Sequence, residues 1–187
     1  MNKYAIKKYL SKSGIGHIIW TAIFLIYAVF ALSSEAWVAA VLCFLGSLYF
    51  FTSPLRTNKK VGNLLKKYED AGRLDEIVKD FENGIYADKQ NLRIGNRMIF
   101  SRRLHTIFDY DEVEKFYLCE EEDNTDDITT TYLCLYLQQK NGNDHLLIKL
   151  SKSRRNQDAM NMACEQIRMK WPSARFGDTD VGECSWN

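Results

Sequence analysis

The sequence predicts an α+β membrane protein, in which a hairpin of two transmembrane helices and a helical connector precede an antiparallel β domain that ends with one helix. Three changes along the 187 residues support this. Residues 1–55 carry only four lysines and one glutamate, residues 56–84 show helical spacing of apolar side chains, and the pattern alternates from Ile85 onward. We therefore expect a hairpin over 1–55, a connector over 56–84, a β domain with its helix over 85–172 and a loose tail over 173–187.

Two uncharged apolar runs near the N-terminus predict membrane-spanning helices over residues 15–33 and 36–53. With its flanks, each run supplies roughly 18 to 20 helical residues, which is close to the thickness of a bilayer. Two buried helices of a soluble domain are the alternative, but such helices normally show a polar stripe, and neither run has one. Gly46 and Ser47 are small enough to let the two helices approach closely.

The charges that flank these runs predict their orientation. Four lysines precede the first run, and Arg56, Lys59 and Lys60 follow the second, whereas the connection carries only Glu35. Because positive charge stays on the cytoplasmic side, we expect a multi-pass protein of the cell membrane with both termini in the cytoplasm. A cleaved signal peptide is the alternative, although the first run exceeds the usual core of roughly 7 to 15 residues. Either topology leaves the later domain in the cytoplasm.

The connector contains two groups of apolar residues at helical spacing, separated by Gly72. A continuous coiled coil would need an unbroken heptad pattern, so two short helices, or one bent helix, are expected instead. Their apolar faces are expected to pack against the adjoining domain, with a second protein chain as the alternative partner. The first group is Val61, Leu64, Leu65 and Tyr68, and the second is Leu74, Ile77, Val78 and Phe81.

Alternating residues predict six or seven antiparallel strands in the β domain. Two of them flank a turn at Asn141 and Gly142, and two shorter ones flank Gly95 and Asn96. A last amphipathic helix, which Pro172 ends, is expected to close a bent sheet or a partly open barrel. The face of this helix that should be buried consists of Met160, Ala163, Cys164, Ile167 and Trp171.

This order of elements resembles the bacterial pleckstrin-homology-like (PH-like) domains of small, uncharacterised membrane proteins that carry two transmembrane helices before the domain. The resemblance rests on LRIGNRMIFSRRLHTIFDYDEVEKFY, residues 92–117, together with the final helix. It covers about the last hundred residues. It implies a barrel of typically seven strands and an interaction role, without naming a ligand.

No sequence motif predicts an enzyme, a cofactor or a metal. His17, His105 and His145 lack the spacing of a ligand or catalytic motif, and the five cysteines contain no CxxC pair. The near-neutral composition beyond residue 55 also argues against nucleic-acid binding. An acidic run could hold a hard cation, but a solvated hairpin tip is the better interpretation. This run contains Glu120, Glu121, Glu122, Asp123, Asp126 and Asp127.

Three hypotheses on function follow from the sequence. The leading one is a non-enzymatic membrane protein whose cytoplasmic domain binds a protein partner or serves as a scaffold. The second is a module that contacts anionic lipid through four basic residues near the start of the β domain, although a turn at Gly95 and Asn96 would direct Arg93 and Arg97 to opposite faces. The third is an accessory subunit of a transporter or membrane enzyme. The four basic residues are Arg93, Arg97, Arg102 and Arg103.

Overall fold

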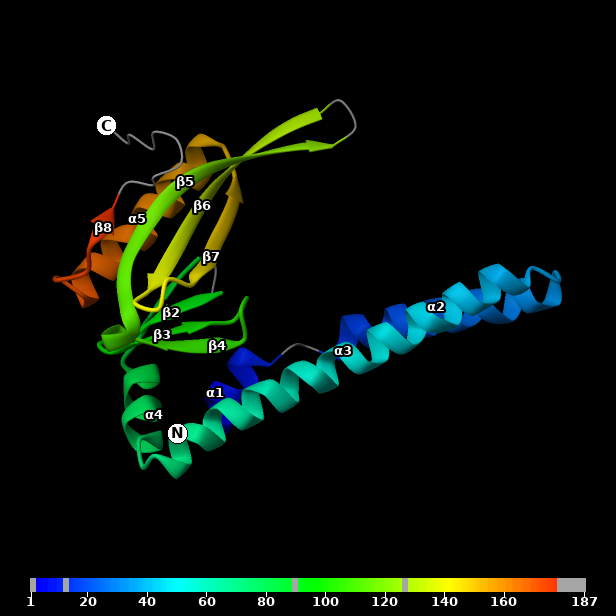
Figure 1. Cartoon of the computed structure of the whole chain (residues 1–187), viewed down its shortest axis with the longest axis horizontal. Coiled ribbons are helices and arrows are strands. Elements are labelled where there is room, and N and C mark those ends of the chain that lie inside the picture. Colours follow the sequence, from blue (N-terminus) through cyan, green and yellow to red (C-terminus); the bar gives the residue numbers. More distant parts are fainter. Residues whose placement is uncertain (1–2, 12–13, 89–90, 126–127, 178–187) are drawn as a thin grey trace. The chain divides into compact units, whose positions relative to one another are not determined.

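The computed structural model describes residues 3–11, 14–88, 91–125 and 128–177 (Figure 1). The chain divides into two compact units at Gly72, which we call the helical unit (residues 2–72) and the β unit (residues 73–187). Helices make up the first part of the chain, and two sheets and a C-terminal helix follow. The predicted α+β class is therefore confirmed.

Helices α2 (Gly14–Ser33) and α3 (Trp37–Asp70) pack along each other in the helical unit. Small side chains fill their contact, since Ala28, Ala31, Ala40 and Ser47 are all buried. At Gly46, an added Cβ atom would lie 3.1 Å from the ring of Phe24, so a larger residue there would press on this ring. Small residues thus set the close approach of the two helices, as the sequence indicated.

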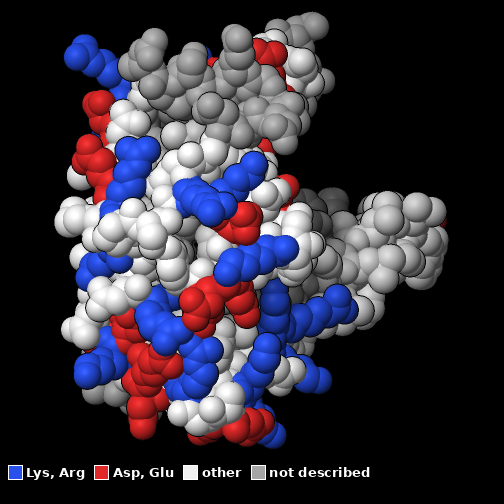
Figure 2. Space-filling view, turned by 60° about the vertical axis from the view of Figure 1, so that its left-hand side comes forward, with Lys and Arg blue, Asp and Glu red and all other residues white. Residues whose placement is uncertain are grey.

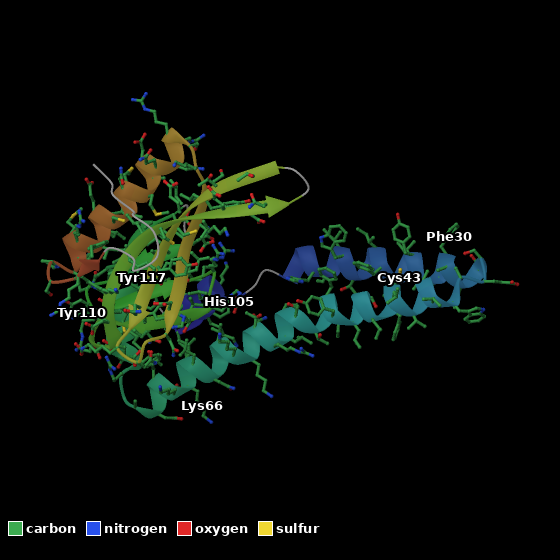
Figure 3. All side chains as sticks on the ribbon, turned by 45° about the horizontal axis from the view of Figure 1, so that its top comes forward. Phe30, Cys43, Lys66, His105, Tyr110 and Tyr117 are labelled. Carbon is green, nitrogen blue, oxygen red and sulfur yellow. The ribbon has the colours of Figure 1, made fainter. Side chains whose placement is uncertain are left out.

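The outward surfaces of α2 and of the first half of α3 are almost entirely apolar and exposed, and side chains project from both helices along their length (Figure 3). Only 11% of the residues in the most apolar stretch of each helix are buried. A core helix of a soluble protein would be mostly buried. The chain therefore contains two helices that are long and apolar enough to cross a membrane.

The turn between α2 and α3 ends the first helix with a Schellman pattern. Glu35 adopts a left-handed φ of 60°, its N–H donates to the carbonyl of Leu32, and the N–H of Ala36 donates to the carbonyl of Ala31 at 2.9 Å. The hydroxyl groups of Ser33 and Ser34 donate to the carbonyl of Phe30. These bonds satisfy the last carbonyl groups of α2, so the chain reverses within three residues.

Helix α3 extends well beyond the predicted end at residue 53, because the first half of the predicted connector continues it as far as Asp70. Val61 and Leu65 form a buried stripe on this extension. A further helix that the sequence analysis did not predict, α1 (Lys3–Leu10), packs on α3 and buries Ile6 and Leu10. Helix α1 has only eight residues, about two turns, which is too short to give a periodic signal.

Gly72, with a φ of 68°, separates α3 from α4 (Leu74–Glu82). The break at this glycine and the two separate helices agree with the prediction. Helix α4 belongs to the β unit and packs on strand β3, with Ile77 and Phe81 buried. The ring of Phe81 meets the ring of Phe100 edge to face, with 5.0 Å between their centroids.

The β unit contains two four-stranded sheets. The first has the antiparallel order β1 (Ile85–Ala87), β2 (Leu92–Ile94), β3 (Met98–Ser101), β4 (Thr106–Asp109), and the short helix η1 (Tyr110–Glu112) follows it. The second has the order β7 (Asp144–Ser151), β6 (Ile128–Gln139), β5 (Val113–Thr125), β8 (Phe176–Gly177). Strand β8 runs parallel to β5 and lies in the segment that was expected to be loose.

Helix α5 (Arg154–Lys170) packs against both sheets and closes the core of the β unit. All five residues of its predicted apolar face are buried. The indole of Trp171, which directly follows the helix, lies 4.7 Å from the ring of Tyr110 and donates to the carbonyl of Gly95 at 3.1 Å. The helix and the strand pattern therefore have the roles that their periodicity predicted.

Two local predictions need correction. The hairpin between β2 and β3 turns at Asn96 and Arg97 rather than at Gly95 and Asn96, since the N–H of Gly95 donates to the carbonyl of Met98 at 2.8 Å. Much of the acidic run also lies within β5 rather than at a loop tip. Glu120 and Glu121 form ion pairs of 2.7 Å with Lys152 and Lys149, which offset the repulsion within the strand. Asp126 and Asp127 lie outside the described residues.

Candidate functional site

Arg93, the first of the four predicted lipid-contact residues, lies inside the β unit. Only 9% of its surface is exposed, and its guanidinium group lies between the rings of Phe81 and Tyr86, at 4.2 and 4.5 Å from their centroids. It donates to the hydroxyl of Tyr86 at 2.8 Å and to the carbonyl of Glu82 at 3.0 Å. These contacts join α4 to the first sheet and leave little of Arg93 for an external ligand.

Arg97 belongs to a network of ion pairs. Its guanidinium group lies 3.1 Å from Glu76 and 2.7 Å from Asp111. Arg73 joins the same network through Glu76 at 3.0 Å and Asp109 at 2.7 Å, and the hydrogen bonds to these two carboxylates raise the pKa of Arg73. The network fixes the start of α4 against the turns that follow β2 and β4.

Arg102 and Arg103 are both exposed in the connection between β3 and β4. Within the described part of the chain, no ion pair involves either side chain. The structure therefore places the four predicted residues in three different settings: buried, ion-paired and exposed. The contact with lipid stays a prediction, and only Arg102 and Arg103 are free to make it.

Asp80 is the charged residue that the sequence analysis missed. Its carboxylate, 7% exposed, accepts hydrogen bonds from the backbone N–H groups of Asn96 at 2.7 Å and Met98 at 2.8 Å, and from that of Arg97 at 3.2 Å. An added Cβ atom at Gly95 would lie 2.0 Å from this carboxylate. Asp80 thus links α4 to the β2–β3 turn. Gly95 has no side chain and so leaves room for this carboxylate, and it is the feature of the sequence that could have indicated the contact.

A groove of about 320 Å³ lies where the edge strands β1 and β7 meet α5; we call it the α5 groove. The described part of the second sheet gives β7 a partner on one side only, β6, so its other edge is unpaired. Met162, 58% exposed, projects from α5 at this groove, and the Oε1 atom of Gln166 is buried there without a hydrogen bond among the described residues. Its other lining residues include Tyr86, Leu150, Asn156 and Ala159.

The outer face of the second sheet carries a second group of interacting side chains. Tyr117 and Tyr136 stack at 5.1 Å across β5 and β6, and the hydroxyl of Tyr136 donates to Glu121. Lys149 donates to the same carboxylate at 2.7 Å and lies 4.5 Å from the ring of Tyr132. The bonds from Lys149 and Tyr136 lower the pKa of Glu121, so this carboxylate is ionised at neutral pH.

Cys119 and Cys134 are directly opposite each other on this face, a pairing that sequence spacing did not reveal. Cys134 has no exposed surface, and burial together with the charge of Glu121 raises its pKa to about 12. Burial also raises the pKa of the Cys164 thiol to about 11. Both thiols are therefore protonated at neutral pH and are poor nucleophiles there.

A second cavity, of about 280 Å³, lies between η1, the start of β5 and the residues after α5. Charges of both signs line it, from Asp111, Glu114, Lys140 and Arg175. Basic and acidic side chains are likewise interleaved over the face of the protein that Figure 2 shows. Among the described residues, no three His, Cys, Asp or Glu side chains come together in a group that could hold a metal ion.

No protein-family model, no curated protein and no solved structure matches the chain.

Proposed function

We propose that the protein is a membrane-anchored, non-enzymatic adaptor whose cytoplasmic β unit binds a protein partner. Helices α2 and α3 form the anchor as a transmembrane hairpin, with both termini in the cytoplasm. Their exposed apolar surfaces support the anchor, and the flanking lysine and arginine residues support the orientation.

We also propose that the β unit has the PH-like fold. The support is its architecture: a sheet of four consecutive strands is followed by three antiparallel strands of a second sheet, which the short parallel strand β8 completes, and one helix closes the core. The raised pKa values of Cys134 and Cys164 agree with a non-enzymatic role, because neither thiol is activated.

The α5 groove is the observation that carries the proposal of a protein partner. The unpaired edge of β7 offers backbone donors and acceptors to an extended peptide, and α5 supplies the apolar floor for its side chains. The occupant that fits is an extended segment of a partner protein with an apolar residue directed at Met162 and Ala159.

Site-specific photo-crosslinking in the cells that naturally make the protein tests this function. A photoreactive amino acid at Met162, in the groove, should give one recurrent cross-linked protein. The same group at Met169 is the matched control, because Met169 lies on the same helix, is 72% exposed and does not line the groove.

A binding assay with the full-length chain and the captured protein completes the test. We expect Ala159→Arg, which fills the groove, to reduce affinity at least tenfold, and Met169→Arg to leave it unchanged. Equal capture from positions 162 and 169, or equal affinity of the two arginine variants, would contradict the proposal.

A further inference from the structure

The two structural units carry opposite net charges. The helical unit has nine basic and three acidic residues, a net charge of +6, whereas the β unit has 16 basic and 21 acidic residues, a net charge of −5. The anionic surface of a membrane thus attracts the helical unit and repels the β unit as a whole. By net charge, α3 of the helical unit is therefore a better candidate for a lipid site than the β unit.

Basic residues of α3 gather on one side of the helix, immediately beyond its apolar half. Arg56, Lys59 and Lys60 are spaced by three and four residues and fall within an arc of about 100°. All three are exposed, whereas Val61 and Leu65 are buried on the opposite side. Within the described residues, none of the three basic side chains forms an ion pair, so each is free to bind an external anion.

The positions of these three residues along α3 correspond to the level of the lipid headgroups. If Trp37 to Leu55 spans the hydrocarbon core, Arg56 is the first residue outside it, and Lys60 lies only about 6 Å further along the axis. Lys66 and Lys67 lie about 15 to 17 Å beyond the core boundary. Since the Debye length is about 8 Å at physiological ionic strength, the first three residues feel the surface charge far more strongly.

We infer that the Arg56, Lys59 and Lys60 face of α3 is a binding site for the phosphate groups of anionic phospholipids in the cytoplasmic leaflet. This inference rests on the proposed transmembrane hairpin. The ammonium and guanidinium groups donate to phosphate oxygens, and the buried stripe of Val61 and Leu65 fixes which side of α3 faces them. The site differs from the arginine cluster of the β unit that the sequence suggested.

Lipid enrichment around the purified full-length protein tests the inference. The protein is exchanged into nanodiscs from an equal mixture of phosphatidylglycerol and phosphatidylcholine, and the lipids that stay with it after delipidation are counted by native mass spectrometry. The wild type should retain the anionic lipid in preference. Arg56→Gln/Lys59→Gln/Lys60→Gln should lower that preference at least tenfold, since each basic residue near a surface contributes roughly fivefold.

The triple variant Lys7→Gln/Lys66→Gln/Lys67→Gln is the matched control, because it removes three exposed lysines of the same unit, of which Lys66 and Lys67 lie further from the core boundary. It should keep most of the preference. Equal losses in the two triple variants, or no loss in either, would overturn the inference while leaving the hairpin intact. Failure of the wild type to enter nanodiscs at all would instead contradict the proposed membrane anchor.

Discussion

At the scale of single residues, a carboxylate and a glycine hold the helix α4 on the first sheet. Asp80 satisfies three backbone N–H groups of the β2–β3 turn, and that of Met98 is buried, so no water replaces the lost acceptor easily. Gly95 leaves the space that the carboxylate occupies. The two residues are therefore coupled, although they are 15 positions apart in the sequence.

This coupling predicts a specific double-mutant result. Asp80→Ala should cost about 2 kcal/mol because buried donors lose their acceptor, and Gly95→Ala should cost a similar amount because its Cβ atom collides with the carboxylate. The double variant should cost at least about 1 kcal/mol less than the sum, since removal of the carboxylate relieves the collision. Urea unfolding of the full-length protein in detergent measures all three values.

Asp75→Ala serves as the control, because Asp75 lies on the same helix and is exposed. It should change the free energy of unfolding by less than about 0.5 kcal/mol. Additive losses in the double variant would show that the carboxylate and the glycine do not share one space.

At the scale of elements, the outer face of the second sheet buries groups that must stay neutral. Burial raises the pKa of Tyr117 to about 12, with a further contribution from Asp144, and burial and Glu121 raise the pKa of Tyr136. Cys134, with a pKa of about 12, lies beside them. Each of these groups ionises more readily in the unfolded chain, so this sheet should be sensitive to alkali.

The sign of this effect follows from the pKa of Cys134. Below its ordinary pKa of 9.0 the thiol is protonated in both states, and the stabilising contribution is fully present. Between pH 9 and 12 only the unfolded chain loses the proton, so the free energy of unfolding should fall as the pH rises. Urea midpoints at pH 7 to 11, followed by tryptophan fluorescence in a chain with Trp20→Phe and Trp37→Phe, would measure the slope.

Cys134→Ala should flatten this slope, whereas Cys43→Ala, in the helical unit, should not change it. The comparison uses slopes because the cavity left by Cys134→Ala lowers stability at every pH. Identical slopes in the two variants would exclude Cys134 as a source of the alkaline sensitivity.

Elements with a clear period could be predicted from the sequence, and elements defined by distant contacts could not. The alternation around Asn141 and Gly142 and the apolar face of α5 predicted their structures because local periodicity determined them. Strand β8 has two residues and depends on the stacking of Phe176 on Phe116, 60 positions away. Short elements of this kind carry no periodic signal.

The predicted arginine site shows the same limit. Sequence proximity grouped Arg93 with Arg97, but the aromatic side chains of α4 and β1 enclose Arg93, whereas Arg97 lies in the β2–β3 turn and forms ion pairs with Glu76 and Asp111. The α5 groove could not be predicted from the sequence either. It forms only where β1, β7 and α5 meet, and no local sequence pattern specifies that contact.

At the scale of the whole molecule, the proposed anchor and the proposed binding unit have different surfaces. The two apolar helices supply the proposed anchor, and α3 continues without a break from its apolar half into a half that carries exposed basic residues. The β unit has a closed core and an unpaired strand edge beside an apolar groove. Its proposed role as an adaptor requires that this groove face the cytoplasm.

In the proposed topology, α2 and α3 cross the membrane as a hairpin with the β unit in the cytoplasm. Labelling with a membrane-impermeant maleimide tests it directly, in a chain whose five native cysteines are replaced by alanine. A single cysteine at Ser34, in the turn between the helices, should react in intact cells, whereas one at Ser153, exposed in the β unit, should react only after the membrane is opened. Reaction of both positions from the same side of the membrane would contradict the hairpin.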